Sequence, residues 1–429
     1  MTGKWCEAFF DQAVIINPPV NLTLGDVYPF VDMQSVDPTR RDVVPSEYRE
    51  FSGGGSRFMS GDTLMARITP CLENGKIGRF LGSSESSIGH GSTEFIVLRG
   101  REGVSDNGFV YYLTRSKLVR NYAISQMSGT SGRQRVPLSA LAHLRAPLPP
   151  LPEQRAIAHI LGTLDDKIEL NRRMNETLEA MARAIFKSWF VDFEPVRAKM
   201  EGRWRPGESL PGLPAYLYDL FPDRLVNSEL GEIPEGWRVA LLGDLLEFIK
   251  GKKPIETIDR PSESLYPVIL IETLDTGASS MYAPSAGMVQ ASTDDVLMIM
   301  DGASSGRVET GHEGLVGSTI AKVIPKQNAP GKRFLYYFLK HIEPETRRHL
   351  TGTSIPHADK SWISQQRICI PSCSEILKNF EQFGDTIRKR IMANYLESRT
   401  LAALRDALLP KLINGEMRVK DAEKFWEYT

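Results

Sequence analysis

The sequence predicts an α+β protein in which two similar strand-rich domains are separated by two long helices that form an antiparallel coiled coil. Three observations predict this fold: two helical stretches share one heptad pattern, short motifs outside them occur twice in the same order, and a proline cluster precedes the first helical stretch. The duplication indicates a pseudo-two-fold internal repeat. With 429 residues, the chain is long enough for two domains that each bury a core.

The first long helix is expected from residue 153 to about residue 193, directly after Pro152, the last proline of the cluster. Its seam residues alternate at spacings of four and three, which is the heptad pattern of a coiled coil and not the 3.6-residue period of a helix on a globular core. About 40 residues at 1.5 Å each give a rod of roughly 60 Å. The seam consists of Ile157, Leu161, Leu164, Ile168, Asn171, Asn175, Leu178, Ala182, Ile185 and Trp189.

The second long helix is expected to follow Pro371 and to end at Pro410. Its seam repeats the same spacing at a constant offset of 219 residues, so that Asn394 matches Asn175. A buried polar pair in a seam costs stability but fixes register, and we expect the two helices to pair with each other. The alternative is two unrelated amphipathic helices that each cap a domain. This seam consists of Ile376, Phe380, Phe383, Ile387, Arg390, Asn394, Glu397, Leu401, Leu404 and Leu408.

Short motifs outside the helices recur in the same order. "SGDTLMARI" at 60–68 recurs as "STDDVLMIM" at 292–300, and "SGTSGRQRVP" at 128–137 recurs as "TGTSIPHADK" at 351–360. Further pairs are "LGD" at 24–26 and 242–244, "GST" at 91–93 and 317–319, and "FVYYL" at 109–113 with "FLYYFL" at 334–339. The expected parts are therefore a first domain (1–152), a central helix (153–200), a second domain (201–373, with an ordered lead-in at 201–236), and a second helix with its tail (374–429).

The distribution of charge favours a polyanionic partner. The net charge is only −1, so nucleic acid would have to bind at local patches. Residues 107–152 and 314–342 contain Lys and Arg but no Asp or Glu, and phosphate contacts need an unopposed positive surface; a solvated basic face is the alternative for either tract alone. Two domains held roughly 50–60 Å apart by paired helices would span roughly 15 base pairs, which suits a reader of a two-part, non-palindromic sequence.

Candidate DNA contacts lie in glycine-containing loops. Within 129–135, Arg side chains can read guanine and Gln134 can read adenine in the major groove; the alternative is that Arg133 and Arg135 bind only phosphate or remain solvated. Asn74 and Gly75 also fit a plain hairpin turn. The candidates of the first domain are Arg67, Asn74, Lys76, Arg133, Gln134 and Arg135, and those of the second are Lys252, Lys253, Ser304, Ser305, Arg307, His357 and Lys360.

No catalytic or metal-ligating constellation is found, so the chain is expected not to be an enzyme by itself. The sequence "NPPV" at 17–20 resembles a base-holding motif of amino-methyltransferases, but Val20 cannot stack on a base. The glycine-rich stretch 82–92 lacks the Gly-Lys-Ser/Thr of a phosphate loop. The carboxylate pairs at 165–166 and 294–295 lack further ligands, and the first pair is expected on a solvated helix face. The four cysteines suggest reduced thiols in a cytoplasmic protein, with no signal peptide or membrane span.

Three stretches resemble the specificity subunits of type I restriction–modification systems. Residues 147–193, "PLPPLPEQRAIAHILGTLDDKIELNRRMNETLEAMARAIFKSWFVDF", look like the central conserved region of that family. "LFPDRLVNSELGEIPEGW" at 220–237 and "LLPKLINGEM" at 408–417 look like other stretches typical of it. The resemblance covers the whole chain, with one departure: no stretch like "IPEGW" precedes the first domain, which leaves its first strand uncertain.

The resemblance implies two target-recognition domains that each read one half of a bipartite, asymmetric DNA target. It also implies assembly with two DNA-adenine methyltransferase subunits and, for restriction, with two ATP-driven nuclease-translocase subunits. S-adenosylmethionine, ATP and Mg would then be used by the partners, and no cofactor would be bound by this chain. The alternatives are a specificity subunit of a methylation-only or related phage-defence system, a coiled-coil scaffold that does not bind DNA, and a self-contained methylating or cleaving enzyme.

Overall fold

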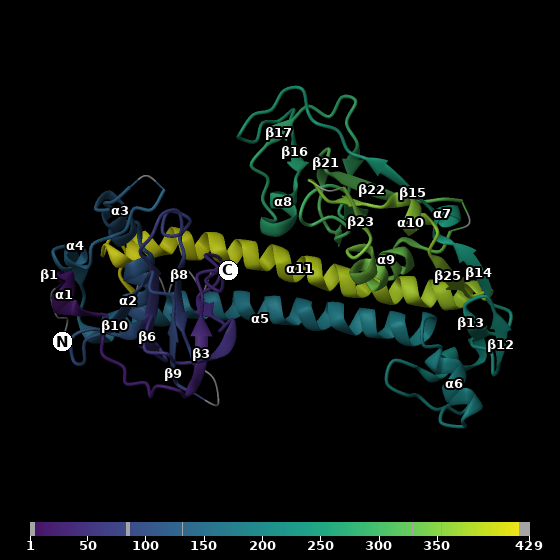
Figure 1. Cartoon of the computed structure of the whole chain (residues 1–429), viewed down its shortest axis with the longest axis horizontal. Helices are drawn as coiled ribbons and strands as arrows, with labels where there is room; N and C mark the ends of the chain where they lie inside the picture. The colour runs from purple at the N-terminus through teal and green to yellow at the C-terminus, as the bar shows by residue number, and fades with distance from the viewer. Residues whose placement is uncertain (1–4, 83–85, 131, 328, 353, 420–429) are drawn as a thin grey trace. The chain divides into compact units, whose positions relative to one another are not determined.

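The computed structural model describes residues 5–82, 86–130, 132–327, 329–352 and 354–419, so the end of the expected tail lies outside the described residues. The chain divides into two compact units. Unit 1 is formed by residues 1–173 and 395–429, and unit 2 by residues 174–394. Two helices of 40 residues each, α5 (Leu151–Phe190) and α11 (Ser374–Ile413), contribute to both units (Figure 1).

The two long helices pair in antiparallel fashion. In unit 1, Arg405 of α11 donates to Asp165 of α5 at 2.6 Å; in unit 2, Asn394 donates to Asn175 at 2.8 Å. The residue number on α11 falls as the number on α5 rises, which fixes the antiparallel direction. The predicted fold class, with its antiparallel coiled coil, is therefore confirmed. The predicted seam residues with apolar or Asn side chains are all buried or half-buried, whereas the seam positions Arg390 and Glu397 are exposed.

The ends of the helices differ slightly from the expectation. The helix α11 does not end at Pro410 but continues to Ile413. Leu412 and Ile413 are fully buried in the core of unit 1, and this burial favours the last turn despite the hydrogen bond that proline cannot donate. The helix α5 begins at Leu151, so Pro152 lies in its first turn, where the missing N–H has no helical acceptor to lose.

Unit 1 contains a five-stranded sheet in the order β2-β10-β7-β8-β4, a four-stranded sheet in the order β5-β3-β9-β6, and the pair β1-β11. Its strands are β1 (Cys6–Phe9), β2 (Val14–Ile16), β3 (Val27–Val31), β4 (Asp42–Val43), β5 (Glu47–Glu50), β6 (Ser56–Met59), β7 (Thr63–Ala66), β8 (Ile77–Phe80), β9 (Ile88–Gly91), β10 (Phe95–Gly100) and β11 (Arg145–Leu148). Its helices, besides the long ones, are α1 (Phe10–Ala13), α2 (Asn107–Arg115), α3 (Lys117–Ser125) and α4 (Leu138–Ala142).

Unit 2 contains two four-stranded sheets, β15-β22-β19-β20 and β17-β16-β21-β18, and the pairs β12-β13, β14-β25 and β23-β24. Its strands are β12 (Leu225–Ser228), β13 (Gly231–Pro234), β14 (Arg238–Leu241), β15 (Leu246–Lys250), β16 (Tyr266–Ile269), β17 (Tyr282–Ala283), β18 (Gln290–Ala291), β19 (Val296–Ile299), β20 (Val308–Thr310), β21 (Gly314–Val316), β22 (Ile320–Pro325), β23 (Leu350–Thr351), β24 (His357–Ala358) and β25 (Arg367–Ile370). Its helices are α6 (Glu194–Met200), the 3-10 helix η1 (Ala215–Leu220), α7 (Leu242–Leu245), α8 (Ile271–Thr276), α9 (Lys332–Thr346) and α10 (Lys360–Ser364).

Each unit packs one aromatic helix against the long helices. In unit 1, Tyr111 and Tyr112 of α2 are buried together with Leu161 of α5. In unit 2, Phe334 of α9 packs edge-on against Phe190 of α5, with ring centroids 4.8 Å apart. The same aromatic motif therefore anchors each strand-rich domain to the coiled coil.

The strand ladders show which positions of the two units correspond. The strand β7 lies between β10 and β8 as β19 lies between β22 and β20. Asp62 precedes β7, is fully buried and accepts from the Met59 N–H at 2.7 Å; Asp295 precedes β19, is 6% exposed and accepts from the Ser292 N–H at 2.9 Å. Asp62 therefore corresponds to Asp295, whereas a letter-by-letter match of the two motifs aligns it with Asp294. The strand pairing and the turn hydrogen bonds determine which residues correspond, and the ungapped sequence alignment of the two motifs is shifted by one residue.

Candidate nucleic-acid interface

Two loops meet beside the central strand of each unit. The strand loop, residues 67–76 in unit 1 and 300–307 in unit 2, joins β7 to β8 and β19 to β20. The helix loop, residues 126–137 and 349–359, leads into α4 and α10; Ser131 and Thr353 within it lie outside the described residues. Isolated bridges join the two loops, between Ile68 and Arg135 in unit 1 and between Asp301 and His357 in unit 2.

Backbone hydrogen bonds make the two loop pairs equivalent. The Val136 N–H donates to the Arg67 carbonyl at 2.9 Å, and the Ala358 N–H donates to the Met300 carbonyl at 2.8 Å. The residue before each donor, Arg135 or His357, therefore occupies the same position on the same backbone. We call this the paired position, because each of these two side chains is paired with a carboxylate.

In unit 1 the paired position is a bidentate ion pair. Arg135 donates through Nη2 to Glu94 Oε1 at 2.7 Å and through Nε to both carboxylate oxygens at 3.0 Å. The hydrogen bond from Arg135 holds the pKa of Glu94 below its ordinary value. Since its Nη1 also contacts the Arg133 carbonyl at 3.4 Å, Arg135 has few donors free for a base edge.

Its neighbours have more freedom. Arg133 is exposed, and within the described residues its side chain has no hydrogen-bond or ion-pair partner. Gln134 is half-buried, and its carbonyl accepts from the Thr69 N–H at 3.0 Å, which ties the helix loop to the strand loop. Arg67 is half-buried, and its Nε is enclosed without an acceptor among the described residues. Arg133 is thus the predicted contact best placed to meet DNA.

The other two candidates of unit 1 lie at the end of the strand loop. Asn74 is exposed in a turn whose next residue, Gly75, has φ +77°, a conformation that favours glycine. Lys76 is half-buried and donates through Nζ to the Met33 carbonyl at 2.6 Å. This bond holds the Lys76 side chain against the protein, so Asn74 is the better placed of the two for a DNA contact.

In unit 2 the paired position carries different chemistry. His357 Nδ1 lies 2.7 Å from Asp301 Oδ1, and Lys250 donates to Asp301 Oδ2 at 2.8 Å. Although burial acts to raise the pKa of Asp301, the hydrogen bonds from Lys250 and His357 hold it below its ordinary value. Lys360, the first residue of α10, is exposed and has no side-chain partner within the described residues. It is an exposed cation directly after this helix loop.

The structure argues against one prediction in the strand loop of unit 2 and weakens another. Ser305 is fully buried and its hydroxyl lies within hydrogen-bonding distance of the Gly302 and Pro356 carbonyls, which argues against the predicted contact with DNA. Arg307, the charged candidate of this loop, donates to Glu309 at 2.7 Å and to Asp275 at 2.5 Å, which neutralises its charge. Of the three candidates, the half-buried Ser304 keeps its position at the surface.

Two lysines follow β15, the edge strand beside β22. Lys252 is exposed but donates through Nζ to the Gly287 carbonyl at 2.8 Å. Lys253 is exposed, and its ammonium group has no partner in the described parts of the chain. Both retain full charge, because a carbonyl does not neutralise an ammonium group.

The acid-free tract 314–342 does not present the unopposed positive surface that was expected. Lys322 and Lys332 both bind Asp295, at 2.7 and 2.9 Å. Arg333 is 3% exposed and binds Asp385 at 2.8 Å. Carboxylates from distant segments therefore offset part of this positive charge, whereas the exposed Lys326 of the same tract donates only to the Gly243 carbonyl. Counting neighbours along the sequence could not detect such partners.

A second correction concerns the acidic pair at 165–166, expected on a solvated helix face. Asp166 is exposed, but Asp165 is 5% exposed and binds both Arg405 and the Tyr112 hydroxyl, each at 2.6 Å. Sequence reasoning also missed the carboxylates Glu94 and Asp301 at the paired positions. For Glu94 one signal existed, since it directly follows the first "GST" motif.

Within the described ranges, no group of three or more His, Cys, Asp or Glu residues lies close enough together to hold a metal ion. Among the same residues, no helix has the length and apolar character needed to cross a membrane.

Comparison with known proteins gives a consistent result. The family model described as "Type I restriction modification DNA specificity domain" matches residues 60–180 and 234–394, once in each half of the chain. The type I restriction enzyme MjaIX specificity subunit of Methanocaldococcus jannaschii is 28% identical over 325 residues, covering 73% of this chain and 69% of that protein. The HindI specificity subunit of Haemophilus influenzae is 28% identical over 384 residues, covering 76% and 81%.

A solved structure shares the fold. The crystal structure of a type I restriction–modification system S subunit from M. genitalium matches with a TM-score of 0.53 and 16% identity, covering 96% of each chain. At this identity the match supports the arrangement of elements within the chain and does not identify contact residues.

Proposed function

We propose that this chain selects the DNA sequence on which its complex acts. The premise is that the chain belongs to the family of type I restriction–modification DNA specificity subunits. Each strand-rich domain reads one half of a two-part, asymmetric target through its strand loop and helix loop. The two long helices set the distance between the half-sites. The expected domain boundaries at residues 152, 200 and 373 are kept as part of this proposal.

One observation carries the proposal: the two units keep one backbone and differ in the polar side chains on it. The paired position is Arg135 beside Glu94 in unit 1 and His357 beside Asp301 in unit 2. A protein that binds a symmetric partner would keep the same groups in both repeats. Different donors on the same frame suit two different half-sites, since bases are distinguished by the pattern of donors and acceptors in the major groove.

Within this proposal the loop residues have different tasks. Arg133 and Gln134 have the donors that match guanine and adenine edges. Lys360 and Lys253 are exposed ammonium groups suited to phosphates, which fix position on the duplex without reading sequence. Arg135 and His357 orient the helix loop through their carboxylates, as pre-organised supports of the reading side chains.

The chain works in a larger assembly. The catalytic steps, with their S-adenosylmethionine, ATP and Mg, belong to two DNA-adenine methyltransferase subunits and two nuclease-translocase subunits in the cytoplasm. The chain contributes the choice of sequence and the surface of the paired helices on which these subunits dock.

The test is to express the chain with its methyltransferase partner in a host free of DNA methylation and to map the modified adenines across the genome. The proposal predicts one two-part sequence with a fixed, unspecified spacer. A contiguous motif would contradict the division into half-sites. Absence of methylation by a complex that assembles and binds S-adenosylmethionine would contradict the role in target selection, as would unchanged methylation without this chain.

A further inference from the structure

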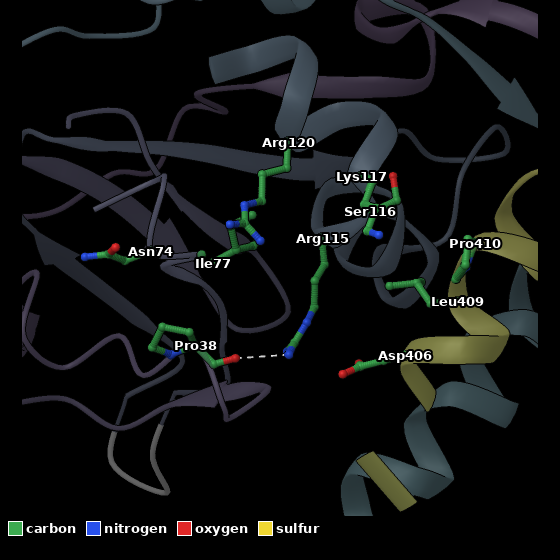
Figure 2. Close-up of a pocket in the computed structure, with 11 residues that line it drawn as sticks. Pro38, Asn74, Ile77, Arg115, Ser116, Lys117, Arg120, Asp406, Leu409 and Pro410 are labelled. Atoms are coloured by element: carbon green, nitrogen blue, oxygen red, sulfur yellow. Dashed lines mark hydrogen bonds between the residues drawn. The ribbon is translucent and has the colours of Figure 1, made fainter. Parts of the chain in front are cut away.

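Unit 1 contains a pocket of about 350 Å³ that the recognition of bases does not use. The junction of α2 and α3 forms one wall, the end of the strand loop forms another, and the C-terminal part of α11 closes it (Figure 2). We propose that this pocket binds a phosphate of the DNA backbone and anchors the duplex independently of its sequence. The inference rests on the proposed function, and it adds a site outside the base-reading side chains.

Positive charge in the pocket is not neutralised by its hydrogen-bond partners. Arg115 donates to the Tyr111 hydroxyl at 2.8 Å and to the Pro38 carbonyl at 3.0 Å. Arg120 donates to the Glu73 carbonyl at 2.7 Å. These acceptors are uncharged, and among the described residues neither arginine forms an ion pair. Both guanidinium groups are therefore held in place by uncharged acceptors and form no ion pair among the described residues, which suits an anion site.

Lys117 and the start of α3 add further donors beside the two arginines. The Nε of Arg120 is enclosed by the protein, so this nitrogen is not one of the donors of the pocket. Lys117 is exposed at the start of α3, a nine-residue helix whose N-cap, Ser116, makes no side-chain cap and whose first turn contains no acidic residue. The N–H groups and dipole of this helix end add to the attraction for an anion. Asn74 lies on the rim, and its amide points away from Arg115 and Arg120 (Figure 2).

One carboxylate lies at the edge of the pocket. Asp406 of α11 faces Arg115 across the opening (Figure 2) and is bound to Arg405 at 2.8 Å. Three cations, Arg115, Lys117 and Arg120, thus line the pocket with one acid, which shares Arg405 with Asp165. The balance in the pocket remains positive.

The chemistry favours a phosphate over the carboxylate of a partner protein. Three cationic side chains and a helix N-terminus offer more donors than the two oxygens of a carboxylate can use, whereas the oxygens of a phosphodiester can accept from several of them. The pocket also borders the strand loop through Asn74. A duplex read by that loop would bring its own backbone to the pocket opening.

The experiment measures binding of the chain, in complex with its methyltransferase partner, to labelled duplexes by fluorescence anisotropy over a range of KCl concentrations. One duplex contains the mapped target and another is unrelated. The main variant is Lys117→Gln with Arg120→Gln, and its control is Lys411→Gln, an exposed lysine of α11 that does not line the pocket. Asp406→Asn serves as a variant of opposite sign.

The double variant is expected to bind both duplexes about tenfold more weakly at low salt, and the slope of log K against log salt is expected to become shallower by about 1. The methylated motif should not change, and Lys411→Gln should have less than half the effect. Asp406→Asn should strengthen binding to both duplexes, a readout that persists even if the double variant folds poorly.

Three results would overturn the inference. Unchanged affinity and salt slope would show that no phosphate is bound, and weaker binding of the target duplex alone would assign the pocket to base recognition. Loss of methyltransferase co-purification, with unchanged DNA affinity of the chain, would assign it to an acidic segment of that partner. Failure of the wild-type complex to bind any duplex would instead refute the proposed function itself.

Discussion

The buried ion pair between Asp165 and Arg405 gives the sharpest prediction about the coiled coil. Both side chains are 4% exposed, and Asp165 also accepts from the Tyr112 hydroxyl, so this one carboxylate joins α5, α11 and the recognition domain of unit 1. Replacing Arg405 by Met leaves a buried, unpaired carboxylate. Breaking a buried pair in this way costs about 3–5 kcal/mol in the free energy of unfolding.

For a unit of this size, such a loss lowers the melting temperature by roughly 6–20 °C, at about 2–4 °C per kcal/mol. The double variant Asp165→Asn with Arg405→Met removes the stranded charge but keeps an acceptor for the tyrosine, so it should regain roughly 1–3 kcal/mol. The control is Arg183→Met, which breaks a pair with Glu179 in which the arginine is 51% exposed. That change should cost less than about 1 kcal/mol.

The assay combines calorimetry with hydrogen exchange of peptides from α5 and α11. Faster exchange should appear in the unit 1 parts of both helices and spare their unit 2 parts. The reasoning is refuted if Arg405→Met melts within 1–2 °C of the wild-type chain. It is also refuted if the double variant is no more stable than that single variant, because the penalty would then not come from an unpaired carboxylate.

Three further predictions concern the spacer, the paired position and a buried thiol. Inserting seven residues beside Asn175 and seven beside Asn394 preserves the heptad phase and should lengthen the preferred spacer in a site-selection experiment. Inserting four residues in one helix alone should disrupt pairing of the helices. An unchanged spacer in an active double-insertion complex would show that the helices do not set the spacer length. Glu94→Gln should release Arg135 and tighten binding to unrelated DNA. Because the pKa of Glu94 is lowered in the folded chain, the ion pair stabilises the wild-type chain above pH 4.5, and this stability is lost as the pH falls through the folded-state pKa. If the Glu94→Gln variant lost as much stability on acidification as the wild-type chain, this role of Glu94 would be contradicted. Burial raises the pKa of the Cys369 thiol to about 12, so a thiol reagent at pH 8 should leave it unmodified in the native chain; rapid labelling would contradict its burial.

The sequence predicts long-range features well where a physical period repeats many times. Ten seam positions at one spacing are hard to obtain by chance, and the structure shows the two helices pairing within two or three residues of the expected ends. The doubled order of motifs likewise predicted the internal repeat. Both signals are sums over many residues, so one misplaced residue does not change the conclusion.

Single-residue features were predicted less well, because their partners are distant in the chain. Arg333 was counted as free positive charge, yet it binds Asp385, 52 residues away. Ser305 was chosen for its loop composition, yet its hydroxyl is consumed by backbone carbonyls. The correspondence between Asp62 and Asp295 follows from strand pairing, and an ungapped alignment of the two motifs does not show it. Composition indicates which loops are rich in donors, and only the fold shows which of those donors are free.

The most direct test of the central claim compares two variants of the complex in one random-target methylation library. Arg133→Ala with Gln134→Ala changes the helix loop of unit 1, and Lys360→Ala changes the first residue of α10, directly after the helix loop of unit 2. The account predicts that the first variant relaxes base preference in one half-site, by about 1–3 kcal/mol per lost base contact. The second should weaken methylation without changing the preferred bases, because Lys360 is assigned to phosphate; the other half-site and the spacer should be unchanged in both. Relaxation of both half-sites by the Arg133 and Gln134 variant, or a uniform loss with no change in preferred bases, would contradict the claim that each domain reads its own half of the target.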